Sequence, residues 1–136
     1  MIHGVVVTHG RVAAELVAVV ESILGPGQGL SALSNQGKGA PELTAAVKAA
    51  CAEAVADDAR GVLLFVDDMA GSCAVACRLA AGVTAQARVL SGVNLAMLLD
   101  FCTWRDSLSS EELARRLVEK GRQAIAILPA NPGDDD

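Results

Sequence analysis

Two short runs of uninterrupted apolar residues constrain the fold of this chain most. The first lies within Gly4–Thr8 and has three consecutive valines at its centre, and the second spans Gly61–Val66. A strand without polar alternation is typical of a parallel sheet that is buried on both faces, and β-branched residues favour strands. Both runs are therefore predicted to be strands of such a sheet.

Helical segments separate the predicted strands. After the first strand, apolar residues recur at helical spacing until Gly25-Pro26-Gly27 ends the pattern. The apolar residues of this helix are Val12, Leu16, Val19, Val20 and Ile23. A weak strand is expected at Leu30–Ser34, and Pro41 suits the start of a second helix that Asp57-Asp58 ends.

The same alternation continues after the strand Gly61–Val66. This strand leads into a polar loop, and Ser72 is expected to cap a third helix, Cys73–Ala81. A fourth strand at Ala87–Leu90 precedes a helix that Asn94 caps. Alternating strands and helices predict an α/β fold, with a mainly parallel sheet and helices on both faces.

The last predicted helix is capped by Ser109 or Ser110, and two glutamates follow in its first turn. Its expected apolar stripe is Leu113, Leu117, Ala124 and Leu128. No internal repeat or linker divides the sequence, so residues 1–130 are predicted to form a single domain. Residues 131–136 are expected to be an acidic, flexible tail.

The predicted topology selects three residues for chemistry. The commonest small fold of this kind has a strand order beginning 2-1-3-4, and ligands bind beside the carboxyl ends of its first and third strands. His9 follows the first strand and Asp67 the third, so both face one crevice. A carboxylate fixes the tautomer of an imidazole and leaves the far nitrogen as a better nucleophile. Ser72 opens the next helix, whose N-terminus is a ready site for phosphate.

Each of these residues also has an ordinary structural interpretation. A lone histidine after a strand is usually a solvated loop residue, an aspartate there usually forms a turn, and a serine after glycine is usually a helix cap. The functional interpretation depends on all three residues falling at the same edge of the sheet.

The composition excludes several classes of function. The net charge is −5 and aromatic residues make up 2% of the chain. This balance provides neither a basic patch nor a stacking platform for nucleic acid or anionic membranes. No apolar run approaches the ~20 residues that span a bilayer. We therefore expect a cytoplasmic protein without signal peptide, membrane insertion or nucleic-acid partner.

The remaining histidine and the cysteines are given structural roles. His3 precedes the first strand and is expected at the surface of the opposite edge, and the four cysteines contain no CxxC pair. Buried thiols in a reducing compartment are the favoured interpretation, with Cys73 as a less favoured redox sensor because it lies at a helix start. With only two histidines, no metal site is predicted. No cofactor is expected either, because the sequence has no Walker loop or dinucleotide fingerprint.

Three short motifs follow one another in order along the chain. They are Val5-Val6-Val7-Thr8-His9-Gly10 with Ala14-Glu15-Leu16, then Val66-Asp67 with Gly71-Ser72, then Gly92-Val93-Asn94-Leu95 with Met97-Leu98. Together they resemble the mannose-family IIA components of the bacterial phosphoenolpyruvate-dependent sugar phosphotransferase system. The resemblance extends over Met1–Leu128 and implies an α/β fold.

The resemblance also implies a phosphotransferase component with a phosphohistidine intermediate. His9 would accept a phosphoryl group from the phosphocarrier protein HPr and pass it to a IIB partner in sugar transport. Asp67 would pair with the histidine, and Ser72 would lie beside the phosphoryl group. We assign Ser72, Gly71 and Thr8 to the predicted phosphate-binding set.

The resemblance further implies a homodimer, because family members often exchange a C-terminal strand. Ala124–Leu128 is the candidate for that strand, although it fits a helix equally well. For access by two partner proteins we expect a partly exposed His9 with Met69 and Leu95 in an apolar docking patch.

The sequence departs from the family pattern at three positions and leaves two other functions open. Ala70, Cys73 and Ala96 stand where the family commonly has Gly, Pro and Pro, which affects the shape of the loops and the fit of partners. Asp68 adds a second carboxylate beside the site. The alternatives are a regulatory module that is phosphorylated on His9 only to signal, and the phosphocarrier subunit of a dihydroxyacetone kinase.

Overall fold

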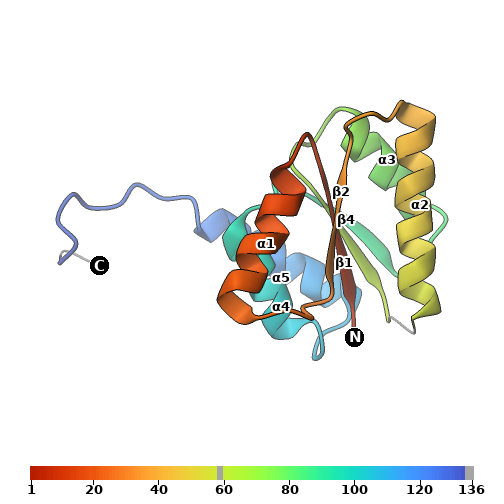
Figure 1. The fold of residues 1–136 in the computed structure, drawn as a ribbon. Coiled ribbons are helices and arrows are strands. Elements are labelled where there is room, and N and C mark those ends of the chain that lie inside the picture. Colours follow the sequence, from red (N-terminus) through yellow and green to blue (C-terminus); the bar gives the residue numbers. More distant parts are fainter. Residues whose placement is uncertain (58–59, 134–136) are drawn as a thin grey trace.

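The computed structural model describes residues 1–57 and 60–133 of the chain. Within these residues, four strands alternate with five helices (Figure 1). The elements are β1 (His3–Thr8), α1 (Val12–Leu24), β2 (Leu30–Ser34), α2 (Ala40–Ala56), β3 (Val62–Val66), α3 (Ser72–Ala81), β4 (Ala87–Ser91), α4 (Leu95–Trp104) and α5 (Ser110–Gln123). Asp58 of the predicted helix end and residues 134–136 of the predicted tail lie outside the described residues. None of the described helices is long and apolar enough to cross a membrane.

The strands form one parallel sheet in the order β2-β1-β3-β4. This order confirms the predicted topology. In the register of the inner strands, Val7 of β1 lies opposite Val66 of β3, and Thr8 lies opposite Ser34 of β2. Three strands therefore end level with one another, and the loops that follow them share one edge of the sheet.

Helices cover both faces of the sheet, as predicted, and create two hydrophobic cores. Helices α2 and α3 pack on one face, and α1, α4 and α5 pack on the other (Figure 1). Successive valines of β1 alternate between them: Val5 and Val7 face α2 and α3, while Val6 faces the other layer. Each fully buried side chain of this size contributes roughly 1.5–3 kcal/mol. In the second core, Phe65 and Phe101 meet edge to face with ring centroids 5.5 Å apart.

The predicted helix α1 is confirmed, and only part of its apolar residues faces the core. Ala13, Val17 and Val20 face the core, whereas Val12, Val19 and Ile23 are exposed. Two apolar stripes run along this helix, so periodicity alone does not select the inner one. The start of the helix decides it, because the Ala13 amide donates to the hydroxyl of Thr8 at 2.6 Å and draws that side of the helix to the sheet.

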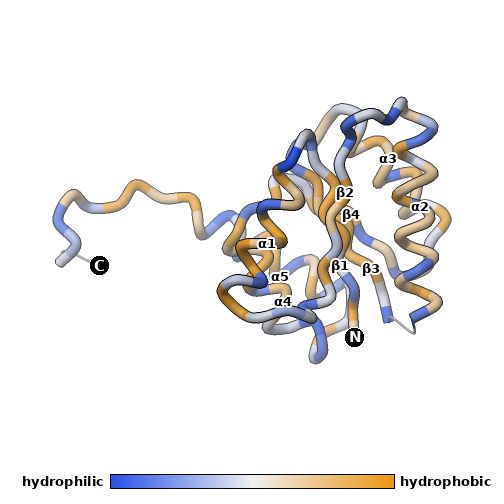
Figure 2. Tube along the Cα trace, in the orientation of Figure 1, coloured by the Kyte–Doolittle hydropathy of each residue, from blue (hydrophilic) through white to orange (hydrophobic). Residues whose placement is uncertain are grey.

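Helix α5 ends at Gln123, so the predicted stripe is wrong at Ala124 and Leu128. The buried stripe runs instead through Leu113, Leu117 and Gly121. The segment after the helix leads away from the body of the protein (Figure 1) and contains a hydrophobic stretch (Figure 2). Ile125, Ile127 and Leu128 are 80–101% exposed. Within the described chain, Ala124–Leu128 belongs to neither a helix nor a strand.

The predicted helix caps are confirmed at two positions and wrong at one. Oδ1 of Asn94 accepts a hydrogen bond from the amide of Met97 at 3.0 Å. Ser109, and not Ser110, caps α5 in a reciprocal pair of hydrogen bonds with Glu112. Ser72 does not cap α3, because Gly71 holds the cap position with a φ of 93°, which favours glycine, and Ser72 is the first helical residue.

Candidate functional site

His9 and Asp67 meet at the carboxyl edge of the sheet. Each is the first residue beyond an inner strand, and the level ends of β1 and β3 place the two residues side by side. Nδ1 of His9 lies 2.9 Å from Oδ2 of Asp67. The backbone amide of His9 donates to the same oxygen at 3.1 Å. One carboxylate oxygen thus holds both the ring and the main chain of the histidine.

This pairing fixes the protonation pattern of the ring. An ionised carboxylate only accepts hydrogen bonds, so the neutral imidazole carries its proton on Nδ1. The lone pair then lies on Nε2, at the far side of the ring. The His9 side chain is 51% exposed and that of Asp67 is 24% exposed. The arrangement is a positioned nitrogen nucleophile that a large partner can reach, and it confirms the expected partial exposure of His9.

The contact with His9 acts on the pKa of Asp67. Partial burial by itself raises the pKa of the carboxyl, but hydrogen bonds from the ring and backbone N–H groups of His9 and the charge of the imidazole act in the opposite direction. Together they hold the pKa of Asp67 below its ordinary value. At neutral pH the Asp67 carboxylate is therefore ionised and accepts the hydrogen bond of the His9 ring.

Asn35 positions the loop that carries His9, a role that the sequence motifs do not reveal. Its side-chain Oδ1 accepts a hydrogen bond from the backbone amide of Gly10 at 3.1 Å. The backbone amide of Asn35 donates to the carbonyl of Thr8 at 3.1 Å. Gly10 has a φ of 57°. The only signal in the sequence is the position of Asn35 just beyond β2, the strand beside β1.

Thr8 does not have the position expected of a phosphate-binding residue. Its side chain is fully buried, its hydroxyl accepts from the amide of Ala13 at 2.6 Å, and it donates to the carbonyl of His9 at 3.3 Å. Both hydrogen-bonding functions of the hydroxyl are thus used inside the protein. Thr8 shapes the turn between β1 and α1 and does not face the crevice.

The start of α3 lies against the same pair of residues. Sγ of Cys73, the second residue of the helix, is within 4.8 Å of ligand atoms of His9 and Asp67. The first N–H groups of a helix have no partner inside the helix, so this end presents free donors beside the histidine. Gly71 and Ser72 are exposed there. In the described part of the chain, the Ser72 hydroxyl makes no hydrogen bond to His9 or Asp67.

The thiol of Cys73 does not have the character of a redox sensor. The side chain is 1% exposed. Burial, and then the charge of Asp67, raise its pKa above the ordinary value, although a hydrogen bond with Ser72 acts the other way. A sensor at a helix start needs a lowered pKa and solvent access, so this alternative for Cys73 is wrong.

The loop after Asp67 frames the mouth of the site. Asp68 is exposed and turned back on its own loop, where Oδ1 accepts from the amide of Met69 at 2.7 Å. The Met69 side chain is 81% exposed. A groove of about 570 Å³ extends from Asp67 and Met69 to Arg122 and Ile125. Leu95, at the start of α4, lines a separate shallow apolar groove together with Val12, Leu16 and Val19 of α1.

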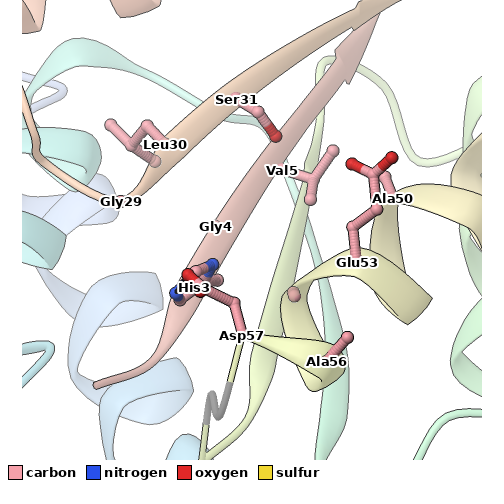
Figure 3. Close-up of a pocket in the computed structure, with 11 residues that line it drawn as sticks. His3, Gly4, Val5, Gly29, Leu30, Ser31, Ala50, Glu53, Ala56 and Asp57 are labelled. Carbon is pink, nitrogen blue, oxygen red and sulfur yellow. Dashed lines mark ion pairs between the residues drawn. The ribbon is translucent and has the colours of Figure 1, made fainter.

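A hollow of similar volume, about 560 Å³, lies at the opposite, amino edge of the sheet (Figure 3). His3 lines it from β1, and its Nε2 lies 3.7 Å from Oδ2 of Asp57. His3 lies at the opposite edge of the sheet from His9, as expected, and its side chain is partly exposed, at 27%. Among the described residues that line this hollow, a histidine and a carboxylate are not joined by the start of a helix, and the carboxyl edge is therefore the candidate site.

Comparison with known proteins agrees with this geometry. The sequence profile of the EIIA-man family, described as the PTS system fructose IIA component, matches residues 4–118. The chain belongs to this family of phosphotransferase system (PTS) IIA components. The matched range includes His9, Asp67 and Ser72, all of β3 and all of β1 except its first residue.

Curated relatives and solved structures extend this result. The mannose-specific EIIAB component of the PTS of Escherichia coli (strain K12) is 32% identical over 130 residues, which are 94% of this chain and 40% of the relative. The chain thus spans about two fifths of the length of the curated relatives it matches.

Two solved structures share the fold over nearly all of the chain. The mannose/sorbose specific IIA subunit from Enterococcus faecalis has a TM-score of 0.81 at 24% identity, covering 95% of this chain and 96% of that one. Component EIIA from Streptococcus agalactiae has a TM-score of 0.82 at 20% identity, covering 93% and 97%. At these identities the likeness establishes the fold.

Proposed function

We propose that this IIA component carries phosphoryl groups on His9, accepting them from phospho-HPr and passing them to a IIB partner of a sugar phosphotransferase system. The observation that carries the proposal is the 2.9 Å contact between Nδ1 of His9 and Oδ2 of Asp67, which leaves the lone pair on Nε2 of a half-exposed side chain. Membership of the IIA family supports the choice of donor and acceptor.

In the transfer step, the Nε2 lone pair of His9 attacks the phosphorus of the donor's phosphohistidine in line. The new P–N bond forms as the donor's P–N bond breaks, and the donor imidazole leaves with the electron pair. The phosphorylated ring of His9 then has both nitrogens substituted and carries a positive charge. Asp67 lies against that charge through the Nδ1–H hydrogen bond, so it stabilises the intermediate.

The start of α3 supplies the anion site for the phosphoryl oxygens. Its free N–H groups and the hydroxyl of Ser72 lie at the edge where His9 is exposed, and Gly71 allows close approach of an anion to the backbone. The field at a helix N-terminus favours an anion by ~0.3–1 kcal/mol. Ser72 and Gly71 are therefore the proposed phosphate-binding residues, without Thr8.

The open mouth of the site suits a reaction between two proteins. A deep pocket would exclude the histidine of a carrier, and His9 is half exposed. The proposed apolar contacts of the partner are Met69, which is exposed in the loop after Asp67, and Leu95, which lines a groove beside the first turns of α1. The chain's net charge of −5 favours approach of a carrier with a basic docking face.

We also propose that the chain forms a homodimer through its C-terminal segment. β4 is an edge strand of the sheet, with one side left unpaired by the described strands. Ile125, Ile127 and Leu128 are exposed apolar residues in a segment without helix or strand structure of its own. Exposed apolar segments and open strand edges are both unfavourable in water. Addition of Ala124–Leu128 to a sheet edge of a second copy covers both.

The proposed relay is tested with phosphoenolpyruvate, the first enzyme of the system, HPr and a IIB protein. Wild-type protein should carry phosphate from HPr to IIB, and His9→Ala should stop transfer at phospho-HPr. His3→Ala is the matched control, since it removes the other histidine of the chain. Transfer through His9→Ala would contradict the proposal. Phosphorylation of His9 without any onward transfer to IIB would favour a regulatory module.

A further inference from the structure

We propose that His9, Asp67 and Cys73 form a binding site for a zinc-like divalent cation, and that the cation blocks phosphoryl acceptance by His9. The three side chains come from three different segments of the chain: the loop after β1, the loop after β3 and the first turn of α3. The sequence predicts no metal site, because the chain has only two histidines. The fold brings Asp67 and Cys73 to His9 as two further ligands.

The geometry brings one donor atom of each residue into a single small space. A ring nitrogen, a carboxylate oxygen and a thiol sulfur all lie within 4.8 Å of one another. Ligand atoms around Zn²⁺ at its usual bond lengths of ~2.0–2.3 Å are separated by less than about 4 Å. Small side-chain rotations are therefore enough to close the three donors around an ion.

A second observation points to an occupant at this place. Oδ1 of Asp67 is buried and has no hydrogen-bond partner among the described residues. Oδ2, in contrast, accepts from both the ring and the backbone of His9. A buried acceptor without a partner is costly. A cation bound to Oδ1 satisfies this oxygen and leaves the backbone hydrogen bond to Oδ2 in place.

The donor set selects the class of cation. One imidazole nitrogen, one carboxylate oxygen and one thiolate are the ligand types of Zn²⁺, whereas Mg²⁺ and Ca²⁺ require oxygen ligands. His9 is the exposed member of the set and Cys73 is buried, so the ion enters from the side of the histidine. The fourth ligand position faces this opening, where water completes the coordination.

Binding changes the protonation of His9 in a way that removes the nucleophile. The cation takes the lone pair of Nδ1, and the proton of the neutral ring then sits on Nε2. Coordination also displaces the thiol proton of Cys73, which is released to the buffer. Nε2 is left as an N–H donor and no longer has a lone pair for phosphorus. The site for the cation stands without the proposed function, but this consequence rests on it.

Cobalt(II) is the direct probe of the site, in the absence of any phosphoryl donor. Co²⁺ bound to a thiolate absorbs in the near ultraviolet, so titration of the full chain should produce this band, and added Zn²⁺ should abolish it. Cys73→Ala should remove the band and weaken Co²⁺ binding by about tenfold or more. Cys77→Ala is the matched control, because it deletes a buried thiol one turn further along α3. Cys73→Ser gives a second test if the alanine variant folds poorly.

Nitrogen-15 spectra of His9 supply an independent readout. Zn²⁺ should move the ring proton from Nδ1 to Nε2, and the same Zn²⁺ should slow phosphoryl acceptance from purified phospho-HPr until a chelator is added. No thiolate band in the wild-type protein, or a band that survives in Cys73→Ala, would overturn the metal site. A cobalt band without any effect on phosphorylation would instead contradict the blocking role, and a chain that binds cobalt but never accepts phosphate would count only against the proposed function.

Discussion

One carboxylate oxygen of Asp67 binds His9 at two atoms: Oδ2 lies 2.9 Å from the ring Nδ1 and 3.1 Å from the backbone nitrogen. The ring orientation and the path of the loop after β1 are therefore coupled. This coupling follows from the sheet, because β1 and β3 are neighbours and end level. A change at Asp67 should act on chemistry through the position of His9.

Replacement of Asp67 by asparagine tests this coupling. Asp67→Asn keeps the shape of the side chain but removes the charge that faces the phosphorylated ring. We expect a folded protein in which phosphoryl transfer is slowed by about 10²-fold, as for the loss of a group that orients a base. Asp68→Asn is the control, because it removes a carboxylate from the same loop whose hydrogen bond, among the described residues, is with the backbone amide of Met69. The rate of phosphoryl transfer from phospho-HPr is measured for both variants in a quenched-flow assay. Equal rates would contradict the role of Asp67.

The lowered pKa of Asp67 predicts a pH dependence of stability. A carboxyl with a lower pKa in the folded state stabilises the fold at pH values above its unfolded value of ~3.9, and that contribution is lost as the pH falls through the folded pKa. The free energy of unfolding, measured with urea from pH 7 to pH 3, should separate wild type from Asp67→Asn at neutral pH. The difference should shrink only below about pH 4. If the difference in the free energy of unfolding grew on acidification, the pKa of Asp67 would be raised by folding, which would contradict this account.

Much of this site follows from local sequence patterns joined to one topological rule. The valine-rich β1 and the apolar β3 predict inner parallel strands, and the strand order then brings His9 and Asp67 together. These features are predictable because burial on two faces and right-handed crossovers restrict the arrangement strongly. The contact itself requires no side-chain information beyond the level ends of two strands.

Features that depend on a single residue of register or on a hydroxyl were not predictable in the same way. The cap of α3 shifts from Ser72 to Gly71 because of one backbone angle. Thr8 turns its hydroxyl to the amide of Ala13 and so leaves the crevice. The apolar period of α5 continues in sequence to Leu128, but nothing in the described chain covers that residue.

A docking surface around His9 is tested at Met69. Met69→Lys places a charge in the proposed contact with the donor, so transfer from phospho-HPr should fall by about tenfold or more, equivalent to ~1.4 kcal/mol of binding. Val83→Lys is the control, because Val83 is also well exposed but lies just beyond the C-terminal end of α3. The folded state of both variants is checked by circular dichroism. An unchanged rate of transfer from phospho-HPr to Met69→Lys would show that the donor does not contact Met69.

Sedimentation tests the proposed dimer. Wild-type protein should sediment at twice the chain mass of 13.9 kDa. Ile127→Asp places a charge in the fully exposed apolar segment, and we expect it to shift the protein to a monomer without loss of the fold. The Val83→Lys variant should remain dimeric. A wild-type monomer at all concentrations would exclude strand exchange through Ala124–Leu128.

The site of phosphorylation itself is the most direct measurement. His3→Ala leaves His9 as the only histidine of the chain, so its phosphorylated form can be examined without ambiguity. After incubation with phosphoenolpyruvate, the first enzyme and HPr, phosphorus and nitrogen NMR should show a phosphoryl group on Nε2 of His9, labile to acid and stable to base, with Nδ1 still protonated toward Asp67. A phosphoryl group on Nδ1 or on another residue, or an unmodified His9 beside fully phosphorylated HPr, would contradict the proposed role of this histidine.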